Sequence, residues 1–101
     1  MKIICKARGE GKTTDAVKVA IETGAYLIVR DRRAVEYLSR EYPDLRFPIT
    51  FDEFLRGESV RGSFVKNFVI DDADEFIRYV CAMKGAMQID AITLPKCNVK
   101  I

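Results

Sequence analysis

The sequence predicts an α/β fold, and three observations support this prediction. Its short apolar segments are apolar along their whole length, which is typical of parallel strands buried on both faces. Longer amphipathic segments with helical spacing separate them. Glycine and proline mark the ends of several of these segments. We therefore expect a single domain over residues 1–101, built as a three-layer α/β/α sandwich with a mainly parallel sheet.

The first half of the chain supplies two predicted strands and two predicted helices. The continuous apolar runs at 2–5 (KIIC) and 25–29 (AYLIV) predict strands. Between them, apolar residues at helical spacing predict a helix over 13–23, which Gly24 ends. A second apolar seam predicts a helix over 31–42, and the proline that follows stops it.

The second half begins with a clear local signal for a helix start. Thr50 and Glu53 have the spacing of a capping box, in which each side chain accepts a hydrogen bond from the other residue's amide. We expect a short helix from this point that ends at Gly57. The remaining predicted elements are a strand over 68–70, a helix over 74–83 and a strand over 88–94.

Composition excludes several kinds of site. The 101 residues contain no histidine, which excludes a Ser-His-Asp triad and the usual zinc sites. No apolar run approaches the ~20 residues of a membrane span, so we expect no membrane partner. Three widely spaced cysteines, Cys5, Cys81 and Cys97, predict reduced thiols packed in the core and a cytoplasmic protein. The net charge of +2 favours no partner.

A glycine-rich basic turn lies between the first predicted strand and the first predicted helix. It fits the end of the phosphate-loop pattern G-x-x-x-x-G-K-[ST], although Lys6 stands where the first glycine belongs. Lys12 would contact the β- and γ-phosphates, and the Thr13 hydroxyl would bind Mg²⁺. The predicted nucleotide-binding residues are Arg8, Gly9, Glu10, Gly11, Lys12, Thr13 and Thr14.

The predicted strand over 68–70 ends in acidic residues. Asp71 at its tip is expected to hold Mg²⁺ beside Thr13. Asp72 is expected to point the opposite way along the strand and to polarise an attacking water, so Asp72 and Lys12 are the candidate catalytic residues. Asp74 and Glu75 are better explained as the cap and first-turn acids of the next helix.

These two segments resemble those of a known superfamily. Gly9-Glu10-Gly11-Lys12-Thr13 resembles a Walker A motif, and Phe68-Val69-Ile70-Asp71-Asp72 resembles a Walker B motif. Together they are similar to the ASCE division of P-loop NTPases, which includes the AAA+, RecA-like and helicase ATPases. Asp72 stands where that division usually carries a glutamate, and Thr93 where it carries a polar sensor residue. Size and the segment 47–52 are similar to small single-domain ATP-binding proteins of bacteriophages.

The resemblance implies a minimal P-loop NTPase core that binds ATP and Mg²⁺ and acts as a slow ATPase in nucleic-acid metabolism, in the host cytoplasm for a phage protein. It also implies a charge-stabilising arginine, for which a second copy or a larger ATPase partner is the expected source. Two alternatives stay open: a nucleotide-binding regulatory subunit without turnover, and a nucleic-acid-binding module with a drifted loop. For the last, the basic cluster Arg30, Arg32 and Arg33 would contact phosphates, although a solvated helix start explains it better.

Overall fold

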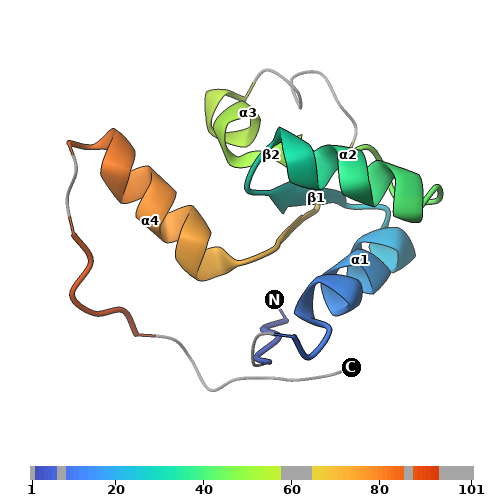
Figure 1. Ribbon diagram of the computed structural model, residues 1–101, viewed down its shortest axis with the longest axis horizontal. Coiled ribbons are helices and arrows are strands. Elements are labelled where there is room, and N and C mark those ends of the chain that lie inside the picture. Colours follow the sequence, from blue (N-terminus) through green and yellow to red (C-terminus); the bar gives the residue numbers. More distant parts are fainter. Residues whose placement is uncertain (1, 7–8, 58–64, 86–87, 94–101) are drawn as a thin grey trace.

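The computed structural model describes residues 2–6, 9–57, 65–85 and 88–93, which form three parallel strands and four helices (Figure 1). The strands lie in the order β2-β1-β3, and both neighbouring pairs run parallel. The predicted α/β class is therefore confirmed. In chain order the elements are α1 (Lys12–Thr23), β1 (Tyr26–Val29), α2 (Arg32–Glu41), β2 (Ile49–Thr50), α3 (Phe51–Arg56), β3 (Phe68–Ile70) and α4 (Ala73–Met83).

The central strand β1 is buried on both faces. Leu27, Ile28 and Val29 are each no more than 2% exposed. Leu27 and Val29 belong to one apolar cluster, whose other buried members are Ala16, Val17 and Ala20 of α1, Val35 and Leu38 of α2, and Leu45. Ile28, with the opposite orientation, belongs to a second cluster that includes Ile49 and Phe51. The continuous apolar character of β1 follows from this two-sided burial.

The helix ends agree with the capping signals in the sequence. Gly24 ends α1 in the left-handed conformation, with φ 69°. The Asp31 carboxylate accepts a 3.0 Å hydrogen bond from the Ala34 amide and begins α2. The capping box of α3 is complete, because Thr50 and Glu53 exchange two hydrogen bonds of 3.1 Å. The predicted helices therefore lie within one residue of the observed ones.

Two predicted strands are wrong. Residues 2–5 lie in no strand, and neither do residues 88–93, the described part of the strand predicted over 88–94. An apolar run becomes a strand only where a neighbouring strand accepts its backbone hydrogen bonds. Residues 2–6 instead lead to the first turn of α1, where Lys6 pairs with Asp15. Conversely, the two-residue strand β2 was not predicted, because its pairing with β1 leaves no periodic pattern in so short a segment.

The prediction of buried cysteines is also wrong where it can be compared. Cys5 is exposed and Cys81 is half-buried, while Cys97 lies outside the described residues. The burial expected for Cys5 depended on the strand over residues 2–5, which does not form. Within the described part of the chain, no helix has both the length and the apolar character needed to cross a membrane.

Phe51 tests the importance of the second apolar cluster. Its ring is 1% exposed and lies 5.1 Å from that of Phe76 and 5.9 Å from that of Tyr79, measured between centroids. Phe51→Ala should lower the free energy of unfolding by ~3–5 kcal/mol, because it leaves a cavity. Urea denaturation would measure the loss. Phe47→Ala is the control, since Phe47 is 62% exposed, and it should change stability by less than ~0.5 kcal/mol. Equal losses for the two variants would contradict this account.

Candidate functional site

The turn before α1 leaves the first backbone amides of the helix without a side-chain cap from the N-cap residue. Gly9 and Gly11 have φ of 85° and 86°, a conformation that side chains other than glycine rarely adopt. Gly11 is the N-cap of α1 and has no side chain to accept from the helix, whose first bond runs from the Asp15 amide to the Gly11 carbonyl. The amides of residues 12–14 therefore have no acceptor within the helix. Such a helix start can bind an anion.

Lys6, which departs from the phosphate-loop pattern, has a clear structural role. Its ammonium group pairs with the carboxylate of Asp15, whose side chain is only 6% exposed. The ion pair fastens the segment before the turn to the first turn of α1. The role of Asp15 was not predicted, although an acid in the first turn of a helix, nine positions after a lysine, is a signal for such a pair.

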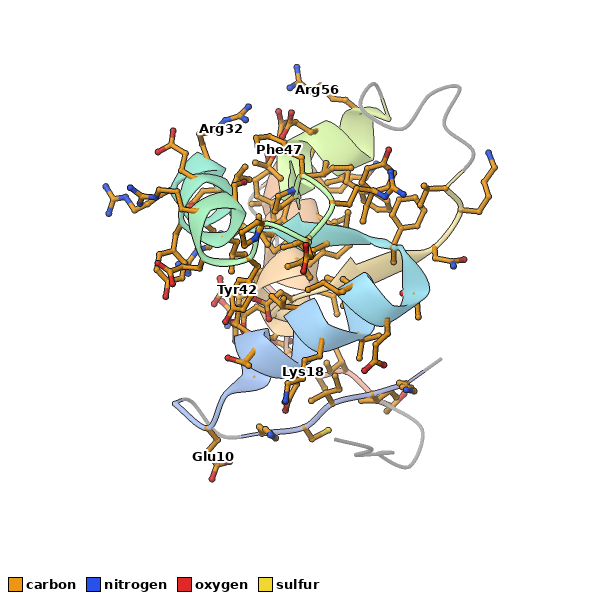
Figure 2. All side chains as sticks on the ribbon, turned by 90° about the vertical axis from the view of Figure 1, so that its right-hand side faces the viewer. Glu10, Lys18, Arg32, Tyr42, Phe47 and Arg56 are labelled. Carbon is orange, nitrogen blue, oxygen red and sulfur yellow. The ribbon has the colours of Figure 1, made fainter. Side chains whose placement is uncertain are left out.

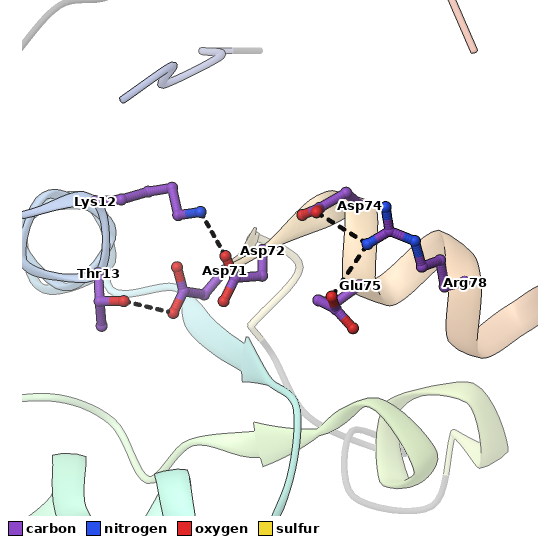
Figure 3. A network of polar contacts seen from close by, with 7 residues as sticks. All are labelled: Lys12, Thr13, Asp71, Asp72, Asp74, Glu75 and Arg78. Carbon is purple, nitrogen blue, oxygen red and sulfur yellow. Dashed lines mark hydrogen bonds and ion pairs between the residues drawn. The ribbon is translucent and has the colours of Figure 1, made fainter. Parts of the chain in front are cut away.

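One hydrogen bond joins the two predicted motifs. The Thr13 hydroxyl donates to Asp71 Oδ2 at 2.9 Å, across 58 positions of sequence (Figure 3). Parallel pairing sets the position of Asp71: Ile70 lies opposite Ile28, and the Asp71 amide donates to the Ile28 carbonyl at 3.1 Å. Because α1 packs on the same sheet, its N-terminus reaches the carboxyl end of β3. The structure therefore brings Thr13 and Asp71 together, as the sequence predicted.

Asp71 is a buried carboxylate with an unused oxygen. It is 9% exposed, and none of the described groups donates a hydrogen bond to its buried Oδ1. Burial raises the pKa of Asp71 above its ordinary value of 3.8, and the hydrogen bond from Thr13 opposes this effect. A hydroxyl and a carboxylate oxygen side by side are ligands that Mg²⁺ prefers. Thr13 and Asp71 could therefore supply two oxygen ligands to such an ion. The described residues contain no group of three or more His, Cys, Asp or Glu side chains that could hold a metal ion.

Lys12 does not point into open solvent. Its ammonium lies 2.6 Å from Asp72 Oδ1, and each of these side chains is 34% exposed (Figure 3). The hydrogen bond to Asp72 raises the pKa of Lys12 above 10.5. The predicted orientation of Asp72 is therefore wrong, since its carboxylate lies on the same side as that of Asp71. The reason is its left-handed backbone, with φ 58° and ψ 66°, which interrupts the alternation of an extended strand.

The other acids nearby are neutralised within α4. Arg78 donates to Asp74 at 3.2 Å and to Glu75 at 3.1 Å (Figure 3). Both acids lie in the first turn of the helix, where negative charge is favourable, as the sequence predicted. The N-cap itself is Asp72 rather than Asp74. Arg78 was missed, although its spacing of three and four residues from two acids was a signal for these pairs.

Other predicted residues of the site lie at the molecular surface. Glu10 and Thr14 are exposed, and Figure 2 shows Glu10 extending outward from the turn. Arg8 lies outside the described residues. Thr93, the expected sensor residue, is exposed and lies in no strand, so its predicted strand-end position is wrong.

The exposed arginines mostly have acidic neighbours. Arg30 lies 3.7 Å from Asp31, Arg32 lies 3.6 Å from Glu53, and Arg56 lies 2.8 Å from Asp52, measured between the charged atoms. Figure 2 shows Arg32 and Arg56 reaching outward at the same end of the molecule. These pairs partly offset the positive charge of Arg30, Arg32 and Arg56 at the surface.

The raised pKa of Asp71 predicts how pH changes stability without a ligand. A carboxyl whose native pKa lies above its unfolded value destabilises the fold when ionised, so stability falls as pH rises through the native pKa. Asp71→Asn removes this dependence. Relative to the natural chain, the variant should gain unfolding free energy as the pH rises from 4 to 7, measured by urea denaturation in EDTA.

Asp44→Asn is the matched control for this measurement, because Asp44 is an exposed acid on the connection between α2 and β2. It should show no such gain. A gain of the same size for both variants would mean that net charge, and not the burial of Asp71, controls the pH dependence.

No protein-family model matches the chain, and no curated protein and no solved structure is significantly similar to it.

Proposed function

We propose that this chain is a P-loop protein that binds Mg·ATP and hydrolyses it slowly, in the service of nucleic-acid metabolism. The observation that carries the proposal is the 2.9 Å contact between Thr13 and Asp71. A hydroxyl directly after Lys12 and a carboxylate directly after a strand are what the two motifs require for a shared magnesium ion. Thr13 and Asp71 are 58 positions apart, so neighbouring residues along the chain do not account for this contact.

Each residue of the site has a defined role in this proposal. The amides that follow Gly9 and Gly11, together with the positive end of α1, would bind the phosphates. Lys12 would contact the β- and γ-phosphates. Thr13 and Asp71 would hold Mg²⁺, which when bound would neutralise part of the phosphate charge. Asp72 would orient or activate the attacking water. Arg8, Glu10 and Thr14 would line the outer part of the turn.

The proposal extends to architecture and setting. The two apolar clusters on opposite faces of β1 support a three-layer α/β/α sandwich as the minimal core of such a protein. An exposed site of this kind would depend on a second copy or a larger ATPase for a charge-stabilising arginine. We place the activity in the cytoplasm, or in the host cytoplasm for a phage protein, where nucleotide and magnesium are present.

Thermal unfolding with Mg·ATP tests the proposal directly. A ligand at a hundred times its Kd adds ~2.7 kcal/mol to stability, which is a rise of roughly 10–20 °C in Tm at this size. The natural chain should show this rise, and Lys12→Ala should lose most of it. Lys18→Ala is the matched control, because Lys18 is exposed on the same helix away from the turn (Figure 2), and it should keep the rise.

The result also separates the alternatives. No change in Tm for the natural chain would contradict nucleotide binding. A rise in Tm without release of phosphate over hours would favour the regulatory subunit without turnover. Salt-dependent binding to single-stranded DNA with no effect of Mg·ATP would favour the nucleic-acid-binding module.

Thr13 tests the magnesium site separately from the phosphates. Thr13→Ala removes the hydroxyl that contacts Asp71, whereas Thr13→Ser keeps it. Calorimetric titration with ATP in Mg²⁺ and in EDTA should show an affinity gain from Mg²⁺ of ~tenfold or more for the natural chain and Thr13→Ser. Thr13→Ala should lose that gain. A full gain in Thr13→Ala would show that magnesium binds elsewhere.

A further inference from the structure

Asp72 has an unusual backbone. Among the described residues it is the one non-glycine residue with positive φ, at 58°. Aspartate tolerates this conformation better than most residues do, but it remains unfavourable for any side chain. Such a conformation persists where its surroundings provide a compensating contact, and it is frequently found at functional sites.

The side chain of Asp72 does not form the hydrogen bond that is usual for an N-cap residue. As the N-cap of α4 it would normally accept a hydrogen bond from the amide two or three residues later. Asp72 makes no such bond. Its carboxylate instead turns to Lys12, at 2.6 Å. Asp72 therefore makes the contact with Lys12 while its backbone has an unfavourable φ and its side chain does not cap α4.

This contact occupies the cation that a phosphate would need. The pair is open to water, since both side chains are 34% exposed, and exposed ion pairs are weak and exchange readily. Asp74 lies only two residues from Asp72, but its carboxylate pairs with Arg78 and not with Lys12. Nearness in sequence alone therefore does not explain why Asp72 pairs with Lys12.

We propose that Asp72 is an internal competitor for phosphate: its carboxylate binds Lys12, and a polyphosphate must displace it. The proposal rests on the proposed function, since it concerns the same Lys12. Displacement breaks one ion pair and forms another, and it frees the Asp72 carboxylate to cap α4 through the Glu75 amide. The apparent affinity for any ligand that uses Lys12 is then the intrinsic affinity multiplied by the fraction of molecules in which the Lys12–Asp72 pair is open.

Calorimetric titration of the full chain with inorganic triphosphate and with ATP, both with Mg²⁺, tests the proposal. Asp72→Asn keeps the size of the side chain and tolerates positive φ, but it removes the charge that holds Lys12. It should bind both ligands roughly three- to tenfold more tightly than the natural chain. Asp74→Asn is the matched control, because it removes the same charge from the same helix start without touching Lys12, and its affinity should change by less than ~twofold. Adenosine, which has no phosphate, should gain nothing from either change.

The outcomes separate this inference from the proposed function. If the natural chain binds and Asp72→Asn binds no more tightly than Asp74→Asn, the competitor role is wrong and nucleotide binding stands. If neither the natural chain nor Asp72→Asn binds triphosphate or ATP, both proposals are overturned. Asp72→Gly, which adopts positive φ without strain, provides the same test should the asparagine variant fail to fold. Loss of a water-activating carboxylate alone would lower kcat and leave Kd unchanged, so the affinity reports on competition and not on catalysis.

Discussion

The two-sided burial of β1 is the constraint on which the rest of this structure depends. A strand that is apolar on both faces must have helices on both sides, and the alternation of its side chains decides what each face contacts. Leu27 and Val29 belong to the first apolar cluster, formed with α1 and α2, while Ile28 belongs to the second apolar cluster, which includes Phe51. Parallel pairing with β3 then fixes where Asp71 emerges, and packing of α1 fixes where Thr13 lies. The site is a consequence of how this strand is covered.

Asp71 and Asp72 have locally unfavourable features, and both make contacts with residues about sixty positions earlier in the sequence. Asp71 is buried with one oxygen unused, which is unfavourable in the absence of a cation. Asp72 adopts a positive φ and leaves α4 without a side-chain cap. Both costs are concentrated in two consecutive residues at the end of one strand. The N-caps of α2 and α3 follow the ordinary rule, since Asp31 and Thr50 each accept a hydrogen bond from an amide of the first helical turn.

The sequence predicted local structure correctly where a residue's neighbours along the chain decide its conformation. Helix ends were predictable because Gly24, Pro43 and the capping box act within a few residues. The meeting of Thr13 and Asp71 was predictable from motif order. The apolar run at residues 2–5 could not be classified, because a strand depends on a partner elsewhere in the chain. The direction of Asp72 was missed for a similar reason: its carboxylate contacts Lys12, sixty positions earlier, from a left-handed backbone that the sequence did not indicate.

The distance in sequence between the two halves of the site has a consequence for folding. Thr13 and Lys12 come from the start of the chain, and Asp71 and Asp72 follow β3, which pairs with β1. Contacts between such distant segments form late, because the loop between them must first be closed. During synthesis, a nascent chain that ends before β3 would carry the glycine turn and α1 without the acids. The contacts of Thr13 with Asp71 and of Lys12 with Asp72 therefore form only once β3 has joined the sheet, so their presence reports that the sheet is complete.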